Sequence, residues 1–276
     1  MKFTKMHGAG NDYVYVDCTR GELANPHELS KKISDRHFGV GSDGLVLICK
    51  SDVADFRMRM FNADGSEAQM CGNAARCIGK YVYDKGLTAK TDLTLETLAG
   101  VKRLTLFADG GKVRRITVDM GLPELTPAKI PVAAGGERAV GLPLEVDGKV
   151  LSVTCVSMGN PHAVTFVKDV RSFDVHRVGK LIEHHALFPE RVNVEFVEPL
   201  SAGELRMRVW ERGSGETWAC GTGACATLVA ATLNNLSDGK AIVHLLGGDL
   251  EVEWDKSSGH VYMTGGAEAV FEGELC

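Results

Sequence analysis

Two cysteine–glycine pairs carry the strongest chemical signal in this sequence. They stand in the segments Cys71-Gly72-Asn73 and Cys220-Gly221-Thr222, where a polar, glycine-rich stretch meets a helix-forming pattern. The N–H groups in the first turn of a helix have no acceptor within the helix, so they bind anions and can lower the pKa of a neighbouring thiol. Each pair therefore predicts a reactive sulfur atom beside a backbone site for a carboxylate.

The two pairs belong to an internal repeat in which equivalent residues are 149 positions apart. In both copies an aromatic residue stands ten positions before the cysteine, a glutamate four before it and an alanine four after it. The same offset relates Asn11 to Asn160, and Gly44 to Asn193. Two unrelated strand–turn–helix segments are the alternative, but the shared spacing favours two halves of similar fold, with the functional site at their interface.

Two thiols supplied by two related halves suit a symmetric acid–base reaction. One thiolate would remove a proton from a carbon, and the other thiol would donate a proton to the opposite face, as a racemase or epimerase without pyridoxal phosphate requires. The N–H groups at both helix starts would stabilise the negative charge that develops on the substrate. The remaining cysteines are interpreted as packing residues, namely Cys18, Cys49, Cys77, Cys155 and Cys225, while the terminal Cys276 is expected to be exposed.

The elements that must position these residues are mostly strands. Runs of alternating apolar and polar residues are typical of half-buried strands, and they occur for example at 13–16, 56–61, 93–97 and 205–210. Helical patterns are fewer, at 26–37, 73–84, 177–186 and 222–235. Many strands with few helices predict an α+β fold with curved, mixed or antiparallel sheets, and they disfavour a doubly wound parallel sheet.

Composition excludes several classes of protein. The 276 residues are 44% hydrophobic and 24% charged, which excludes a disordered or collagen-like chain. The net charge of −5, with no basic run, gives no reason to expect nucleic acid or a membrane surface as partner. The sequence contains no apolar stretch of about 20 residues, no secretory pattern and no cysteine spacing typical of zinc. We therefore expect a cytoplasmic protein with free thiols and no metal site.

Five motifs together resemble the diaminopimelate epimerase family over essentially the whole chain. They are Met6–Asp12, Phe61–Ser66 leading to Cys71–Cys77, Gly159–His162, Arg191–Asn193, and Trp210–Gly213 leading to Cys220–Gly223. The related proline racemases carry histidine after the first cysteine–glycine pair, where this chain has Asn73. Phenazine-type isomerases, a third related group, lack the pair of cysteines.

The resemblance implies a fold and an activity. The fold would be two similar, pseudo-symmetric α+β domains, each a curved sheet or near-barrel around a central helix, with residues 1–120 plus 265–276 in one domain and 121–264 in the other. The activity would be pyridoxal-independent interconversion of LL- and meso-diaminopimelate by two cysteines, in lysine and cell-wall precursor synthesis. Such an isomerase needs no cofactor, binds a small-molecule substrate, and is expected to form a homodimer.

The resemblance also implies roles for individual residues. Cys71 and Cys220 would be the two bases, and His162 with Glu211 would set their protonation states. The substrate would be bound by Asn11, Asn62, Gly72, Asn73, Asn160, Asn193, Glu211, Arg212, Gly221 and Thr222. Some family members carry glutamine where this chain has Gly44, so a side-chain contact from that position is absent and Gly44 is not assigned to the site.

Other interpretations remain open at this stage. The chain could be a two-thiol racemase or epimerase for another amino acid, a thiol redox protein that oxidises Cys71 and Cys220, or a non-catalytic amino-acid-binding protein. The asparagines could only cap turns. Glu211 and Arg212 could form a solvated strand end, and His162 could be structural.

Overall fold

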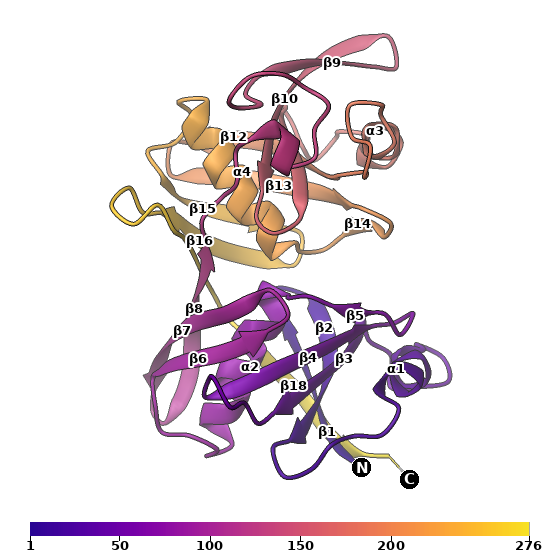
Figure 1. The fold of residues 1–276 in the computed structure, drawn as a ribbon, viewed down its shortest axis with the longest axis vertical. Coiled ribbons are helices and arrows are strands. Elements are labelled where there is room, and N and C mark those ends of the chain that lie inside the picture. Colours follow the sequence, from indigo (N-terminus) through magenta and orange to yellow (C-terminus); the bar gives the residue numbers. More distant parts are fainter. Residues whose placement is uncertain (276) are drawn as a thin grey trace. The chain divides into compact units, whose positions relative to one another are not determined.

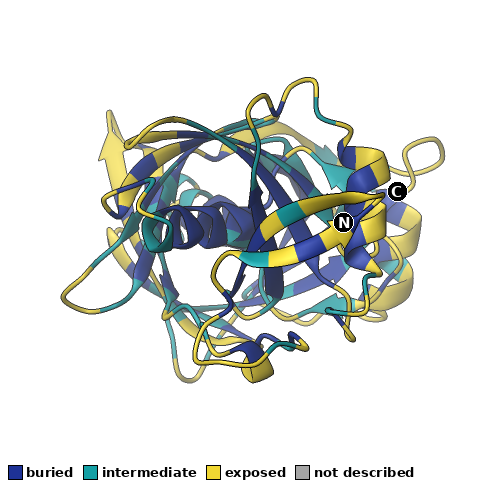
Figure 2. Cartoon of the chain, turned by 90° about the horizontal axis from the view of Figure 1, so that it is seen from above, coloured by how far each residue is buried: buried dark blue, intermediate teal, exposed yellow. Residues whose placement is uncertain are grey.

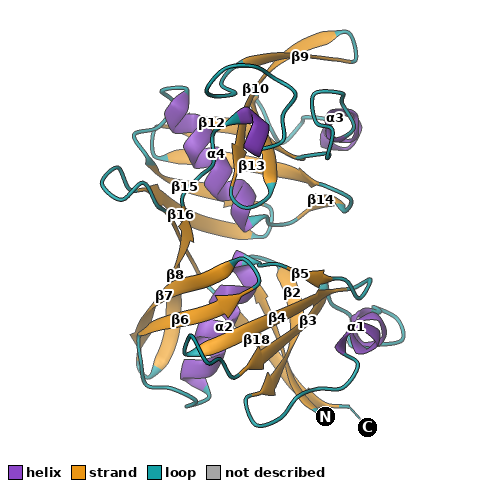
Figure 3. Cartoon of the chain, in the orientation of Figure 1, coloured by secondary structure: helices purple, strands orange, loops and turns teal. Residues whose placement is uncertain are grey.

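The structure is a computed structural model that describes residues 1–275. The expectation of an exposed Cys276 lies outside the described residues. The chain divides into two compact units, Met1–Asp119 with Thr264–Cys276, and Met120–Met263 (Figure 1). Strands outnumber helices in both units (Figure 3).

The first unit holds two helices. Its elements are β1 (Lys2–Gly8), β2 (Asn11–Cys18), α1 (Pro26–Ser34), β3 (Gly44–Cys49), β4 (Phe56–Asn62), β5 (Glu67–Ala68), α2 (Gly72–Asp84), β6 (Asp92–Thr97), β7 (Gly100–Asp109), most of β8 (Lys112–Gly121), and β18 (Glu268–Glu274). The strand β1 pairs with β2 and β18 in antiparallel fashion, and β2 pairs with β3 in parallel. The sheet continues through β4 and β6 to β7, with antiparallel, parallel and antiparallel pairing, and β5 forms a short hairpin with β4.

The second unit holds the remaining elements. They are η1 (Pro127–Lys129), β9 (Leu142–Val146), β10 (Lys149–Ser157), β11 (Pro161–Phe166), α3 (Val175–Glu183), β12 (Asn193–Ser201), β13 (Glu204–Glu211), β14 (Gly215–Thr217), α4 (Gly221–Leu233), β15 (Lys240–Leu245), β16 (Gly248–Trp254) and most of β17 (Val261–Gly265).

The two units share one order of strand pairing. From β10 through β11, β12, β13 and β15 to β16, the pairs are antiparallel, parallel, antiparallel, parallel and antiparallel, the same series that runs from β1 to β7. Helices α1 and α3, and helices α2 and α4, begin and end 149 residues apart. The predicted α+β class with two similar halves is therefore confirmed.

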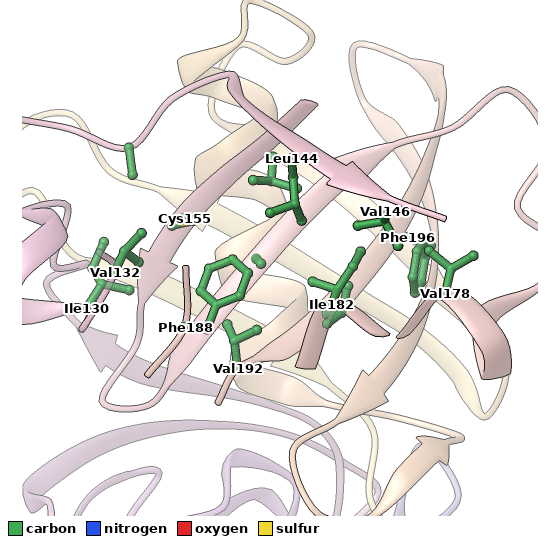
Figure 4. Close-up of a cluster of buried hydrophobic side chains, with 14 of the residues drawn as sticks. Ile130, Val132, Leu144, Val146, Cys155, Val178, Ile182, Phe188, Val192 and Phe196 are labelled. Atoms are coloured by element: carbon green, nitrogen blue, oxygen red, sulfur yellow. The ribbon is translucent and has the colours of Figure 1, made fainter. Parts of the chain in front are cut away.

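Each unit has a buried helix at its centre. Nine of the thirteen residues of α2 and ten of the thirteen residues of α4 are buried, so both helices are enclosed rather than laid on a surface. Figure 2 shows a helix in the dark blue of buried residues within a ring of strands. In the second unit a further cluster of aliphatic and aromatic side chains, including Ile182, Phe188 and Phe196, fills the space between α3 and the sheet (Figure 4).

The strands β3 and β12 were not among those predicted from alternating apolar and polar residues. All but the last residue of β3 and the first five residues of β12 are buried, but only β3 is a continuous apolar run, since β12 buries the polar residues Asn193 and Glu195 among apolar ones. Each is paired in parallel on one side and antiparallel on the other, and both of its faces are covered. In residues 1–275, no helix is both long enough and apolar enough to span a bilayer.

Candidate active site

Cys71 is the residue that precedes helix α2. Its backbone is extended, with φ −139° and ψ 120°, and its carbonyl accepts the first helical hydrogen bond from the N–H of Ala75 at 2.9 Å. The side chain of Cys71 is half-buried. Because the next N–H groups, those of Gly72 and Asn73, lie in the first turn of the helix, they have no acceptor within it. The structure thus places the first predicted sulfur at a helix N-terminus.

A chain of amide groups connects Cys71 to charged residues. The Sγ–H of Cys71 donates to Oδ1 of Asn11 at 3.5 Å, and Nδ2 of Asn73 donates to the same oxygen at 3.3 Å. On its other side Asn11 donates through Nδ2 to the carboxylate of Asp43 at 2.8 Å. Asn73 in turn accepts from the guanidinium of Arg76 at 2.9 Å. Asn11 and Asn73 therefore both lie beside the sulfur of Cys71.

Asn62 and Gly44 are paired neighbours on strands β4 and β3. The Nδ2 of Asn62 donates to Oγ of Ser66 at 3.0 Å, which closes the turn after β4. A Cβ atom at Gly44 would lie 2.0 Å from the carbonyl oxygen of Phe61 and 2.9 Å from the ring of Tyr13. No side chain fits at position 44, since real Cβ atoms are not found under 3.0 Å from such neighbours.

Cys220 precedes helix α4 in the same way. Its backbone is extended, with φ −122° and ψ 109°, and its sulfur accepts a hydrogen bond from the N–H of Gly223 at 3.3 Å. The hydroxyl of Thr222 lies 3.5 Å from the sulfur. Unlike Cys71, Cys220 is almost completely buried, with 5% of its surface exposed.

The Cys220 thiol departs from the expectation of a lowered pKa. Burial raises the pKa of Cys220 well above its ordinary value, and the carboxylates of Glu211 and Glu195 raise it further. The hydrogen bonds from Thr222 and Gly223 act in the opposite direction but are weaker. Desolvation and two negative charges therefore raise the pKa of Cys220 by more than the helix N-terminus lowers it. As a result, Cys220 holds a proton in the ligand-free chain.

His162 lies beside Cys220 in a cluster that also contains Glu195. The Nδ1 of His162 is 2.7 Å from Oε1 of Glu195, and both side chains are fully buried. The other ring nitrogen, Nε2, is 3.0 Å from Oδ1 of Asn160. A ring nitrogen, a carboxylate oxygen and the Cys220 sulfur lie within 4.8 Å of one another. A Cβ at Gly223 would approach Glu195 to 2.7 Å, so glycine leaves room for this carboxylate.

The residue types in this cluster are also those of a metal site, but its geometry is that of a hydrogen bond. Two ligands about 2.0–2.1 Å from a tetrahedral zinc ion are roughly 3.3 Å apart. The 2.7 Å separation between His162 and Glu195 is instead the length of a strong charge-assisted hydrogen bond. We therefore interpret these two side chains as a hydrogen-bonded pair.

Asn193 and Glu183 hold the segment that carries Glu211 and Arg212. The amide of Asn193 accepts from the backbone N–H of Arg212 at 2.9 Å and donates to the carbonyl of Pro161 at 2.8 Å. The buried carboxylate of Glu183 accepts from the N–H of Gly213 at 2.9 Å and from the indole of Trp210 at 2.7 Å. Glu211 itself accepts from the hydroxyl of Thr217, and the guanidinium of Arg212 donates to the carbonyl of Glu190 at 3.1 Å.

Each unit thus brings its own predicted residues together. Asn11 and Asn73 lie near Cys71, while His162, Glu211 and Thr222 lie near Cys220. Asn62 and Asn193 are engaged in local hydrogen bonds. Four residues that contact these groups were given no role from the sequence, namely Asp43, Arg76, Glu183 and Glu195. A signal existed for Glu195, a charged residue between Val194 and Phe196 in a strand.

A search against protein-family models matches the model described as diaminopimelate epimerase, over residues 3–126 and 154–270. Among curated proteins, the diaminopimelate epimerase of Acetivibrio thermocellus is 60% identical over 275 residues, covering 100% of this chain and 98% of the relative. The diaminopimelate epimerase of Methanococcus maripaludis strain S2 is 56% identical and covers 100% of this chain and 99% of the relative.

Solved structures share the fold at low sequence identity. A phenazine biosynthesis protein of the PhzF family from Bacillus anthracis superposes with a TM-score of 0.73 at 20% identity, covering 100% of this chain and 99% of that one. A probable proline racemase from Agrobacterium radiobacter gives a TM-score of 0.71 at 15% identity, with 100% and 92% covered. These likenesses are evidence for the fold alone.

Proposed function

Because the chain belongs to the diaminopimelate epimerase family, we propose that it interconverts LL- and meso-diaminopimelate, with Cys71 and Cys220 as the two proton-transferring groups. The enzyme is an isomerase, and its substrate is a small molecule. The reaction moves one proton from the α-carbon to one sulfur while the other sulfur delivers a proton to the opposite face. The product then has the inverted configuration at that carbon.

One observation carries this proposal: in each unit a cysteine stands at the N-terminus of the central helix. A helix N-terminus presents unpaired N–H groups to an anion. Gly72, Asn73, Gly221 and Thr222 would bind the carboxylate next to the reacting carbon through these groups. The same donors stabilise the enolate-like charge that forms when the α-proton leaves, which is the main barrier to removing so weak an acid.

The other predicted residues complete the proposed chemistry. The high pKa of Cys220 supports this cysteine as the proton donor in the ligand-free chain, with Glu211 and the His162–Glu195 pair as the groups that control its proton. Arg212 would bind the distal carboxylate, since guanidinium suits carboxylate geometry. Asn11, Asn62, Asn160 and Asn193 would contact the distal amino-acid group, directly or through the segments they hold.

Hydrogen exchange in heavy water tests the two-base reaction. Each stereoisomer is incubated separately, and deuterium at the α-carbon is measured in recovered substrate and in product at less than a tenth of full conversion. Two bases place solvent deuterium in the product much faster than in the substrate, because the abstracted proton and the delivered proton are on different sulfurs. Equal labelling of both pools at early times would contradict the proposal and indicate one base.

Single substitutions test the two cysteines. We expect Cys71→Ala and Cys220→Ala, measured separately, each to lower kcat by about 10²–10⁴, the usual contribution of one general acid or base. The matched control is Cys49→Ala, a half-buried thiol at the end of β3 that has no role in this proposal. Wild-type turnover in either of the first two variants would refute the two-cysteine reaction.

A second candidate is a two-thiol racemase for another amino acid, because two cysteines at equivalent helix N-termini fit inversion at any carbon beside a carboxylate. A substrate panel decides between them: racemisation of proline without turnover of LL-diaminopimelate would reverse our choice. If the chain is a thiol redox protein, we expect electron transfer that depends on a disulfide. If it only binds an amino acid, we expect ligand affinity without exchange of the α-hydrogen.

Several further assignments belong to the same proposal. We propose no requirement for pyridoxal phosphate or metal, a cytoplasmic location, a homodimer, and a place in lysine and cell-wall precursor synthesis. The proposed domains are residues 1–120 with 265–276, and 121–264, and the compact units that end at Asp119 and Met263 support them. Light scattering tests the dimer, and turnover after exhaustive dialysis against a chelator and a carbonyl reagent tests the cofactor prediction.

A further inference from the structure

The orientation of the Asn11 and Asn73 side-chain amides beside Cys71, that is, which side carries the oxygen and which the NH2 group, is set by their neighbours. The carboxylate of Asp43 can only accept hydrogen bonds, and it accepts from Nδ2 of Asn11 at 2.8 Å. The guanidinium of Arg76 can only donate, and it donates to Oδ1 of Asn73 at 2.9 Å. Between them, Nδ2 of Asn73 donates to Oδ1 of Asn11 at 3.3 Å. Asp43 is an acceptor at one end of this chain, and Arg76 is a donor at the other end. If the amide of Asn11 or Asn73 rotated by 180°, it would place an oxygen against an oxygen or an N–H against an N–H at both of its contacts. The orientation of both amides is therefore fixed.

This direction decides which atom of Asn11 faces the sulfur. The atom is the carbonyl oxygen, which accepts from Sγ–H of Cys71 at 3.5 Å. A carbonyl oxygen beside sulfur favours the thiol, because it has no proton to donate to a thiolate. If the Asn11 amide were reversed, its N–H would face the sulfur and favour the thiolate.

Asp43 is itself held firmly in place. Its second oxygen accepts from Arg36 at 3.0 Å, and the oxygen that binds Asn11 also accepts from the backbone N–H of Asp12 at 3.1 Å. Arg36 contacts Asp12 as well, at 3.1 Å, and Lys5 completes the cluster by pairing with Asp12. Asp43 thus links a partly buried charged cluster to the amide beside the sulfur of Cys71.

We propose that Asp43 is a positioning residue that orients the amide of Asn11 and thereby keeps the proton on Cys71 in the ligand-free enzyme. Arg76 secures the same orientation from the other end of the chain of amides. The assignment of Cys71 as a catalytic base rests on the proposed function, whereas the orientation rests on the hydrogen bonds alone. Cys71 then begins as a thiol, and it acts as a base only after substrate displaces or reorients Asn11 and the half-buried sulfur releases its proton to solvent.

Other titratable groups lie near Cys71 on its own helix and on β2. Arg76 and Cys77 lie on the same helix, and Tyr15 approaches from β2. The cluster of Asp12, Arg36 and Lys5 lies beyond Asp43.

The test is the pH dependence of Cys71 alkylation by iodoacetamide, followed for each cysteine by mass spectrometry, since only the thiolate reacts. Asp43→Asn replaces an acceptor by an amide that can pair with a reversed Asn11. We expect the pH of half-maximal alkylation of Cys71 to fall by roughly one unit, the shift for exchanging one hydrogen bond to the thiol for one to the thiolate. Asp43→Glu retains an obligate acceptor and should stay near the wild-type value.

Asp12→Asn is the matched control. It removes one negative charge from the same cluster and leaves the acceptor for Asn11 in place, so we expect less than half the shift of Asp43→Asn. A wild-type alkylation profile for Asp43→Asn would overturn the proposal, and so would an equal shift in Asp12→Asn, because charge rather than amide direction would then be the cause. If wild-type enzyme fails to epimerise diaminopimelate, the proposed function fails, and the alkylation result still decides the role of Asp43.

Discussion

Glu183 provides a quantitative test of how the segment with Glu211 and Arg212 is held. Its carboxylate is 4% exposed and accepts from the indole N–H of Trp210 at 2.7 Å and from the N–H of Gly213 at 2.9 Å. In Glu183→Gln one oxygen remains as an acceptor, and the amide NH2 then faces one of the two donors. One charge-assisted hydrogen bond is lost and a buried donor is left without a partner.

The cost follows from these contacts. Losing a hydrogen bond to a charged group, or leaving a buried donor unsatisfied, costs about 2 kcal/mol. For a chain of this size that free energy corresponds to a fall of about 4–8 °C in Tm. Because the neighbouring Arg212 is proposed to bind substrate, KM should rise more than kcat falls.

The measurements are thermal unfolding followed by circular dichroism, and steady-state kinetics with LL-diaminopimelate. Glu204→Gln is the control, because Glu204 is exposed at the start of β13 and should change neither quantity. A variant of Glu183 with a Tm within about 1 °C of wild type and an unchanged KM would refute the reasoning that this carboxylate holds the segment.

Two further predictions concern stability. Gly44→Ala should lower the free energy of unfolding by about 3 kcal/mol, because its Cβ would lie 2.0 Å from a carbonyl oxygen of β4, whereas Gly21→Ala has nothing within 4 Å and should be neutral in urea titrations. At alkaline pH, burial raises the pKa of Cys155 to about 12, so the unfolded chain releases this proton first and stability falls above about pH 9, by up to about 1.4 kcal/mol per pH unit. Cys155→Ala should show a shallower decline of Tm between pH 8 and 11, and an identical decline would contradict the assignment.

Much of the local structure could be predicted from residue spacing. The predicted helix over 73–84 is observed as Gly72–Asp84, and the one over 222–235 as Gly221–Leu233, because apolar residues recur at helical spacing directly after each cysteine–glycine pair. The repeat offset predicted two similar halves, since equivalent sequence patterns form equivalent elements. The strand β3 escaped prediction, because a strand buried on both faces has no alternation.

The candidate site could be predicted only in part. Motifs identified the two cysteines, His162 and Glu211, whereas Glu195 and Asp43 have no motif and act through neighbours distant in the sequence. His162 and Glu195 meet because β11 and β12 are parallel neighbours. Strand pairing of this kind depends on the whole sheet, which a local pattern does not specify.

The sequence by itself determined where the two sulfurs stand on their helices, since a cysteine followed by glycine at the start of an apolar helical repeat is a local property. The surroundings that control the protons of these sulfurs come only from the tertiary structure. The pKa of Cys220 is raised by burial and by carboxylates from β12 and β13, and the amide beside Cys71 is directed by Asp43. Both effects depend on desolvation and on charges brought close by folding, and neither is present in the local sequence.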